Sequence, residues 1–263
     1  MRSGERNKTP KSVTERTDLI FSAFEGDGRP LTFSDIARRT GLPKTTVYRT
    51  VIQLADLDWL RRTDRGFTLS DRIFRLVSAV PARIELREAA LPFMQDLFEA
   101  THETVHLAVR NGAHALYVEK IVGRRQVTAL TKVGGLMPLH CTAVGKVLLA
   151  NADAETQATV LAANLVSHTS ATIHTASAMR AELQKIRDAG TAYDREEAAR
   201  GLVCVACPIT SPEGAVIGAI SVAGGVQRFR PDQVSTAVRT AAFGINRSLT
   251  MRALRADSTA SEN

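Results

Sequence analysis

The sequence predicts an α+β protein with two domains, and three observations support this prediction. The chain has 263 residues, which is long for one compact core. Its first 70 residues contain three short helical patterns and then a hairpin pattern, whereas candidate strands and helices alternate beyond residue 104. Several of those strands are joined by hairpin-length links, so we expect a mostly antiparallel sheet.

The first 12 residues are predicted to be a disordered basic lead, because they are polar and contain no apolar run. Apolar residues then recur at helical spacing from residue 14 to 24, and the glycines and proline of "EGDGRP" end this helix. A second helix is expected within residues 31–40. Pro43 begins a third helix, since proline is tolerated in the first turn.

The segment "WLRRTDRGFTLS" predicts a β-hairpin. Two short runs of apolar and polar residues, 59–62 and 67–69, flank a turn at residues 63–66. Three helices followed by a hairpin describe a winged helix-turn-helix, which we assign to residues 13–71.

The stretch "TGLPKTTVYRT", Thr40–Thr50, has the features with which two helices pack in a helix-turn-helix. Ala37 allows close contact, Gly41 tolerates the positive φ of the turn, and Val47 anchors the second helix. Burial of that face leaves the N-terminal half of the third helix pointing outward, where such motifs enter the major groove. The predicted DNA-contacting residues belong to this surface and to the wing: Lys44, Thr45, Thr46, Tyr48, Arg49, Arg62 and Arg65.

The distribution of charge supports a polyanionic partner for the first domain. Residues 1–80 carry 15 Lys and Arg against 10 Asp and Glu, a net charge of +5, whereas the remaining residues carry 19 against 17, a net charge of +2. The excess positive charge therefore accompanies the predicted winged domain, as expected for a domain that binds nucleic acid. The alternative interpretation is a bundle of three helices with a solvated charged face.

A linker helix is predicted over residues 72–90 and a second domain over residues 91–252, because the helical pattern after the hairpin is broken near Pro81 and Pro92. Residues 253–263 are expected to be a disordered tail. The strands predicted in the second domain are 104–111, 114–122, 126–133, 202–210 and 215–224, and the predicted helices are 142–150, 176–190 and 231–249.

Two motifs with metal-binding spacing do not predict a metal site. Cys204 and Cys207 are three residues apart in a predicted strand, so they should point to opposite faces. "HETVH", His102–His106, has the spacing of a zinc-protease helix but falls where a helix passes into a strand. Ser221 lacks the flanking glycines of a nucleophile elbow, so we expect no enzymatic activity, no metal and no cofactor.

The cysteine count and the distribution of apolar residues predict the cellular location of the chain. Three cysteines, an odd number, provide no disulfide framework. The polar N-terminus is unlike a secretory signal, and no apolar run approaches the ~20 residues that span a bilayer. We therefore expect a cytoplasmic protein that does not bind membranes.

Three long segments are similar to one family. They are "TGLPKTTVYRTVIQLADLDWL" in the first domain and "VGGLMPLHCTAVGKVLLA" and "GTAYDREEAARGLVCVACPITSPEGAVIGAISVAG" in the second. From about Val13 to Met251 the chain resembles the IclR family of bacterial transcriptional regulators. The resemblance implies a winged helix-turn-helix DNA-binding domain, a linker helix and a GAF-like α/β effector-binding domain. It also implies three partners: double-stranded operator DNA, a small-molecule effector and further copies of the chain, as a homodimer or a dimer of dimers.

The resemblance places the effector beside the loop and helix start that follow "PLH". The matching positions are Ala143, Val144, Asp194, Leu202, Cys204 and Ser221. Backbone N–H groups of residues 142–145 would form an anion site, and Asp194 would accept from a ligand hydroxyl or cap neighbouring backbone N–H groups. Compared with family members that bind small acids, Ala223 removes a donor and Val144 adds bulk. The expected effector is therefore a more apolar organic acid, aromatic or branched.

Together these features predict a ligand-responsive transcriptional regulator whose affinity for its operator is altered by a small organic acid. We expect a repressor. The alternatives are an activator of a catabolic operon and an enzyme that acts on a small acid, with the first domain as a tether.

Overall fold

The chain divides between Pro81 and Ala82 into two compact units, which are described separately. The computed structural model describes residues 12–25, 28–77, 80–124 and 131–260. Residues 1–11 of the predicted disordered lead lie outside the described residues. Among the residues that are described, no helix is both long and apolar enough to cross a membrane.

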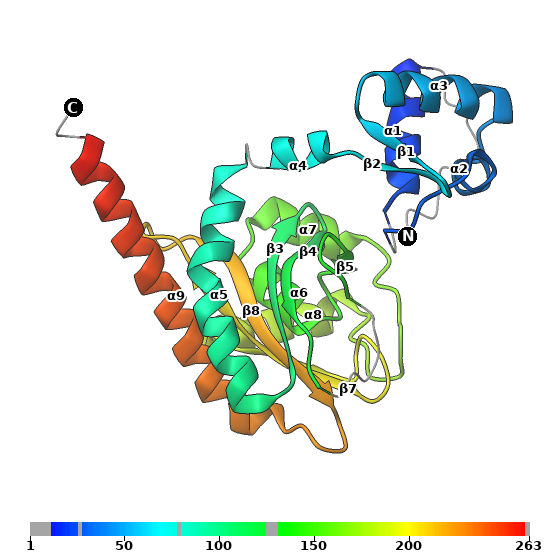
Figure 1. The fold of residues 1–263 in the computed structure, drawn as a ribbon. Coiled ribbons are helices and arrows are strands. Elements are labelled where there is room, and N and C mark those ends of the chain that lie inside the picture. The colour runs from blue at the N-terminus through cyan, green and yellow to red at the C-terminus, as the bar shows by residue number, and fades with distance from the viewer. Residues whose placement is uncertain (1–11, 26–27, 78–79, 125–130, 261–263) are drawn as a thin grey trace. The chain divides into compact units, whose positions relative to one another are not determined.

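The first unit is a winged helix-turn-helix, as predicted. Its elements are α1 (Val13–Ala23), α2 (Phe33–Thr40), α3 (Lys44–Asp56), β1 (Leu60–Thr63), β2 (Gly66–Leu69) and α4 (Asp71–Val77) (Figure 1). The two strands pair antiparallel to form the wing. Apolar side chains from the three helices and the wing make one core, which includes Ile20, Ile36, Val51 and Phe67.

Two glycines determine the turns of this unit. Gly41 ends α2 in the left-handed conformation, with φ of 72°, which side chains disfavour. Gly66 has φ of +134°, and a Cβ atom there would lie 2.4 Å from the carbonyl oxygen of Leu31. Leu31 and Phe67 exchange two backbone hydrogen bonds, at 2.9 and 2.8 Å. The wing is therefore tied to the segment before α2 at a position where only glycine fits.

The second unit has three layers, a sheet between two groups of helices (Figure 1). The strands follow the order β5-β4-β3-β8-β7-β6, and all neighbouring strands are antiparallel, as predicted. The elements are α5 (Pro81–Thr101), β3 (Thr104–Asn111), β4 (His114–Ile121), β5 (Leu136–Pro138), α6 (Ala143–Ala150), α7 (Ala154–Ala162), α8 (Ala176–Ala189), β6 (Ala192–Arg195), β7 (Leu202–Thr210), β8 (Val216–Gly225) and α9 (Pro231–Ala260).

The two faces of the sheet follow from the alternation of side chains along its strands. Cys204 and Ala206 of β7 pack in the core that α6, α7 and α8 cover. Val205 and Cys207 pack in the opposite core, which α5 and α9 cover. The prediction that Cys204 and Cys207 point to opposite faces is confirmed.

The boundary of the second unit differs from the prediction. α5 passes through Pro92 without a break, and Leu86, Ala90 and Met94 of this helix are buried in the core of the second unit. Apolar contacts along that face compensate for the backbone hydrogen bond that Pro92 cannot make. The second unit therefore starts at Ala82 instead of residue 91, and the predicted linker helix, 72–90, is divided between α4 and α5.

Three further predictions of secondary structure were incomplete. α9 continues to Ala260, into the segment predicted to be a disordered tail. Most of the strand predicted at 126–133 lies outside the described residues, and residues 131–133 are not in a strand. The short elements β5, β6 and α7 were not predicted, because they are held mainly by their neighbours in the fold. The junction at His102 is as expected: α5 ends, the residue is left-handed, and β3 begins at Thr104.

Candidate functional site

The N-terminal half of α3 presents the predicted DNA-contacting residues to solvent. The four exposed residues are Lys44, Thr45, Tyr48 and Arg49, and Thr46 is half-buried. Val47, Thr50 and Val51 of the same helix are buried. The ring of Tyr48 is beside that of Phe33, with centroids 5.0 Å apart. The helix thus packs through its apolar side, and its charged and hydroxyl groups point outward.

The electrostatics of this surface suit an anion. The first turn of α3 contains no acidic residue, and Pro43 provides no side-chain cap for its N–H groups. These N–H groups have no intrahelical acceptor and lie at the positive end of the helix dipole. Within the part of the chain that the structure describes, Lys44, Arg49 and Arg62 form no ion pair. Three cations are therefore available to a polyanionic partner.

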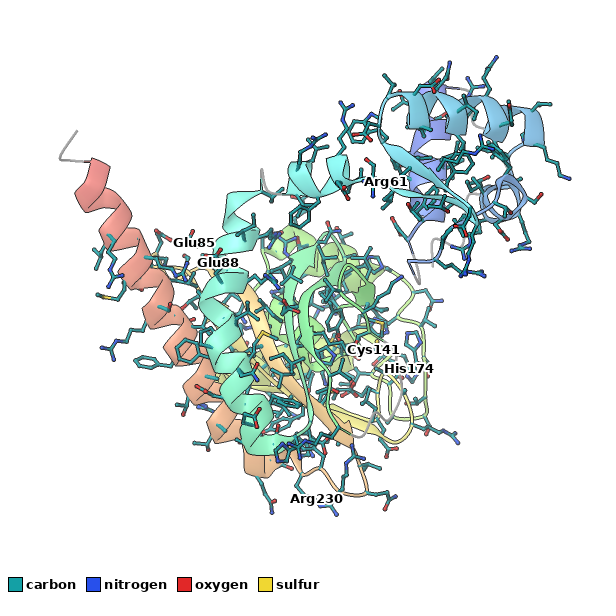
Figure 2. The ribbon with its side chains drawn as sticks, in the orientation of Figure 1. Arg61, Glu85, Glu88, Cys141, His174 and Arg230 are labelled. Carbon is teal, nitrogen blue, oxygen red and sulfur yellow. The ribbon has the colours of Figure 1, made fainter. Side chains whose placement is uncertain are left out.

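The arginines of the wing differ in their surroundings. Arg62 is exposed on β1. Arg65 is exposed at the turn, where the carboxylate of Asp64 lies 3.8 Å away. Arg61, labelled in Figure 2, is paired with Asp71 of α4. Arg62 and Arg65, the two wing residues in the predicted site, are thus more accessible to a phosphate than Arg61 is.

The six predicted effector residues converge on the face of the sheet that α6 covers. Three of them, Ala143, Val144 and Cys204, belong to one buried apolar core. Leu202 is partly buried and packs against that core. Asp194 is the register partner of Cys204, and Ser221 is the register partner of Ala206. Because register partners in antiparallel strands point to the same side, these two polar side chains face the same core.

Asp194 is buried, with 1 % of its surface exposed. Its Oδ1 accepts backbone hydrogen bonds from Glu197 at 2.7 Å and Ala198 at 3.3 Å. Burial raises the pKa of Asp194 to about 7, although the backbone N–H of Glu197 lowers it. Of the two roles expected for this carboxyl group, capping of backbone N–H groups is the one that the geometry shows.

The start of α6 offers fewer anion-binding groups than expected. The Oγ1 of Thr142 accepts a hydrogen bond from the backbone N–H of Gly145 at 3.0 Å. This N–H is therefore satisfied within the protein. The N–H groups of Ala143 and Val144 come first in the helix and have no intrahelical acceptor. They remain the candidates for binding a carboxylate.

Two aromatic residues of this face were not predicted from the sequence. His106 on β3 is the register partner of Ser221, and its ring lies 5.1 Å from that of Tyr117 on β4. Its Nε2 is 2.8 Å from the hydroxyl oxygen of Thr131. Burial lowers the pKa of His106 to about 3, with a contribution from Lys120, so the imidazole is neutral. Burial also raises the pKa of Tyr117, so its phenol remains a donor.

A buried ion pair was also missed. Nζ of Lys146, a residue with 1 % of its side chain exposed, lies 2.5 Å from Glu197 and 3.0 Å from Glu182. The second oxygen of Glu197, Oε2, is buried and has no hydrogen-bond partner among the described residues. Glu197 therefore belongs to the interior and contains an unsatisfied acceptor, whereas the neighbouring Glu196 is half-buried.

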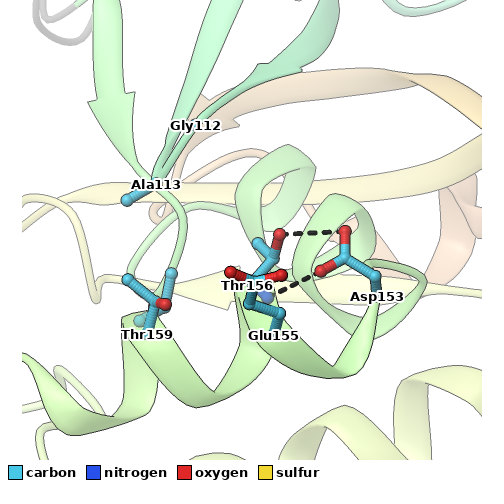
Figure 3. Close-up of a pocket in the computed structure, with 7 residues that line it drawn as sticks. Gly112, Ala113, Asp153, Glu155, Thr156 and Thr159 are labelled. Carbon is cyan, nitrogen blue, oxygen red and sulfur yellow. Dashed lines mark hydrogen bonds between the residues drawn. The ribbon is translucent and has the colours of Figure 1, made fainter.

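A separate pocket of about 330 Å³ lies between the β3–β4 turn and the start of α7 (Figure 3). Its lining residues are Gly112, Ala113, Asp153, Glu155, Thr156, Thr159 and Val160, none of which is a predicted effector residue. Asp153 caps α7 by accepting from the N–H of Thr156 at 2.7 Å. Two carboxylates on its lining make this pocket unfavourable for an acid, so it is not a second candidate for the effector site.

Comparison with known proteins identifies both units. Residues 13–64 match the IclR helix-turn-helix domain, and residues 78–247 match the C-terminal domain of the bacterial transcriptional regulator IclR. The chain is 30 % identical over 211 residues to the HTH-type transcriptional regulator XynR of Escherichia coli (strain K12). This match covers 79 % of the present chain and 84 % of XynR. The chain is also 29 % identical over 222 residues to the HTH-type transcriptional repressor AllR of the same strain, which covers 83 % and 82 %.

A solved structure agrees with this assignment over nearly the whole chain. An IclR homologue from Microbacterium hydrocarbonoxydans in complex with 4-hydroxybenzoate has a TM-score of 0.84 and 30 % identity, and the match covers 90 % of this chain and 99 % of that one. The predicted fold class and the resemblance seen in the sequence are both confirmed. The chain belongs to the IclR family of bacterial transcriptional regulators.

Proposed function

We propose that this regulator is a dimeric repressor that binds operator DNA through α3 and the wing and responds to an aromatic acid bound beneath α6. The observation that carries the proposal is the N-terminus of α3. It is uncapped, free of acidic residues and flanked by Lys44 and Arg49, which have no ion-pair partner among the described residues. Such a helix end can bind phosphate and place an arginine at base edges.

A mobility-shift titration on the intergenic DNA upstream of the gene, at fixed salt, tests the DNA-binding surface. Arg49→Ala should weaken operator binding by ~1–3 kcal/mol and relax sequence specificity. Lys44→Ala should weaken binding to all sequences alike and reduce the salt slope by about 1. Arg180→Ala removes the same charge from an exposed position on α8 and is the matched control. Equal binding by Arg49→Ala and Arg180→Ala would refute the assignment of α3 to DNA.

Three features support an aromatic acid as the effector. Val144 and Leu202 provide apolar walls. The N–H groups of Ala143 and Val144 at the start of α6 have no intrahelical acceptor and suit a carboxylate. The unsatisfied Oε2 of Glu197 suits a hydroxyl donor. 4-Hydroxybenzoate, the ligand of the Microbacterium homologue, has both a carboxylate and a hydroxyl group on an apolar ring.

Calorimetric titration with 4-hydroxybenzoate, benzoate and pyruvate tests this choice. The two aromatic acids should bind and weaken the operator complex, and pyruvate should not. Ser221→Ala should reduce the response without changing DNA affinity, whereas Ser177→Ala, an exposed serine on α8, should behave like the natural protein. A full response in Ser221→Ala would place the effector elsewhere, and binding of pyruvate alone would contradict the argument from the apolar walls.

A second copy of the chain is the proposed cover for α4. No residue of this helix is buried, and Phe74, Leu76 and Val77 are 74 %, 50 % and 54 % exposed. An apolar helix face of this kind is typical of an interface between chains. Val77→Asp should lower the mass measured by sedimentation, and Val133→Asp, at a 55 % exposed position in the second unit, should not. A tetrameric mass for the natural protein would indicate a dimer of dimers.

Repression without catalysis completes the proposal. The similarity to AllR, a repressor, supports this sign of regulation. Deletion of the gene should raise expression from the operator that the protein binds, whereas an activator would give the opposite result. The purified protein should leave 4-hydroxybenzoate chemically unchanged, and turnover of that acid would restore the enzyme alternative.

A further inference from the structure

Two histidines and a cysteine meet beside the start of α6. A ring nitrogen of His140, Sγ of Cys141 and a ring nitrogen of His168 all lie within 4.8 Å of one another. His140 and Cys141 directly precede the N-cap of α6, and His168 belongs to the loop after α7. The two imidazole rings are nearly parallel, with an angle of 25° and a centroid distance of 5.9 Å. The proposed DNA and effector contacts use none of these three side chains.

His140 is held in the form that can bind a metal ion. Its Nε2 lies 3.0 Å from the carbonyl oxygen of Val166. A carbonyl oxygen only accepts, so Nε2 carries the hydrogen and Nδ1 carries the lone pair. A backbone carbonyl that holds the second nitrogen is the usual support of a metal-binding histidine.

Cys141 and His168 contribute different properties to the cluster. Cys141, labelled in Figure 2, is fully buried. Its sulfur therefore lies on the interior side of the cluster, away from solvent. His168 is exposed, so an ion can reach the cluster from the solvent side and then meet the two buried donors.

We propose that His140, Cys141 and His168 form a binding site for a divalent ion of the zinc type. Two imidazole nitrogens and one thiolate are the ligands preferred by Zn²⁺ and Co²⁺, whereas Mg²⁺ and Ca²⁺ prefer oxygen. Three protein ligands leave the fourth tetrahedral position to water or to an anion. Binding replaces the S–H bond of Cys141 with a sulfur–metal bond and releases one proton per ion.

The cluster must contract to hold such an ion. Metal distances of ~2.0 Å to nitrogen and ~2.3 Å to sulfur place tetrahedral donors about 3.3–3.6 Å apart. The present separations of up to 4.8 Å therefore need to shorten by about 1 Å. The exposed side chain of His168 can supply this movement by rotation, while His140 stays fixed by its hydrogen bond to Val166.

Titration of the full-length, chelator-treated protein with Co²⁺, without DNA or effector, tests the site. One Co²⁺ per chain should produce a thiolate-to-cobalt charge-transfer band in the near ultraviolet and intense visible bands of a four-coordinate ion. Zn²⁺ should displace the cobalt and remove the bands. An indicator dye in weak buffer should record one released proton per ion. Absence of the charge-transfer band in the natural protein would overturn the proposal.

Two variants test the ligands, and a third is the control. Cys141→Ser should lose the charge-transfer band, and His168→Ala should weaken Co²⁺ binding by at least about 10-fold. Cys207→Ser is the matched control, because this buried cysteine faces the opposite core and is outside the cluster, and it should keep both the band and the affinity. His168 is exposed, so its variant is expected to fold even if Cys141→Ser does not. Unchanged cobalt binding in His168→Ala would refute the site.

Discussion

Asp194→Asn is expected to change how the stability of the second unit depends on pH. Burial raises the pKa of Asp194 from 3.8 to about 7 in the folded protein. Between these two values the folded chain binds more protons at this site than the unfolded chain does. The stability that this group contributes is therefore fully present below about pH 4 and is lost as the pH rises through about 7. Asparagine retains an oxygen for the backbone N–H groups of Glu197 and Ala198 but does not ionise in this range.

The size of the effect follows from the two pKa values. A group with these values makes the free energy of unfolding about 2–3 kcal/mol smaller at about pH 8 than at about pH 5. The Asn variant lacks this contribution. The difference in the free energy of unfolding between the natural protein and Asp194→Asn should therefore change by about 2–3 kcal/mol between about pH 5 and about pH 8. Asp96→Asn, at an exposed position on α5, should leave the pH dependence unchanged.

Urea unfolding followed by circular dichroism at several pH values, with a chelator present, measures this difference. The single tryptophan, Trp59, belongs to the first unit, so its fluorescence identifies the transition of that unit and separates it from the second. If the free energy of unfolding changes with pH in the same way for the natural protein and for Asp194→Asn, the carboxyl group titrates in its ordinary range. The argument from burial would then be wrong.

Three further substitutions test the packing of the two units. Gly66→Ala should destabilise the first unit by about 1–3 kcal/mol, because Gly66 has positive φ and a close backbone neighbour. Gly28 also has positive φ but is surrounded by open space, so Gly28→Ala should cost less. Urea titration detected by tryptophan fluorescence measures both. Lys146→Met should destabilise the second unit by about 3–5 kcal/mol, because it leaves the buried carboxylate of Glu197 unpaired. The double variant Lys146→Met, Glu197→Gln should recover much of this loss in urea unfolding. No recovery would contradict the pairing. Thr142→Ala should cost about 1 kcal/mol through loss of the α6 cap, and an unchanged unfolding midpoint would argue against that cap.

The winged unit was predictable because its determinants act over a few residues. Gly41 ends α2 through its own φ, and the buried positions Val47 and Val51 of α3 recur at helical spacing. The surface left over after this burial is the predicted DNA-contacting surface. Prediction failed where distant contacts decide the outcome. Pro92 has the local signature of a helix break, yet α5 continues because its buried face packs against the sheet and α9.

The effector side shows the same division. The resemblance of long segments singled out Asp194, Cys204 and Ser221 as effector candidates, and the register of β6, β7 and β8 then placed them on one side of the sheet. The sequence alone determined the helix-turn-helix, its outward residues and the antiparallel character of the second unit, because turns, caps and periodicity are local properties.

Only the tertiary structure decided which groups meet. It places Lys146 against Glu197, 51 residues away in the chain, His106 opposite Ser221, and His168 beside His140. These contacts depend on strand register and on the packing of loops over the sheet, and neither leaves a periodic signal in one sequence. Burial then sets the charge of each group, which is why the protonation of Asp194 and the availability of the His140 lone pair followed from the fold and not from the residue types.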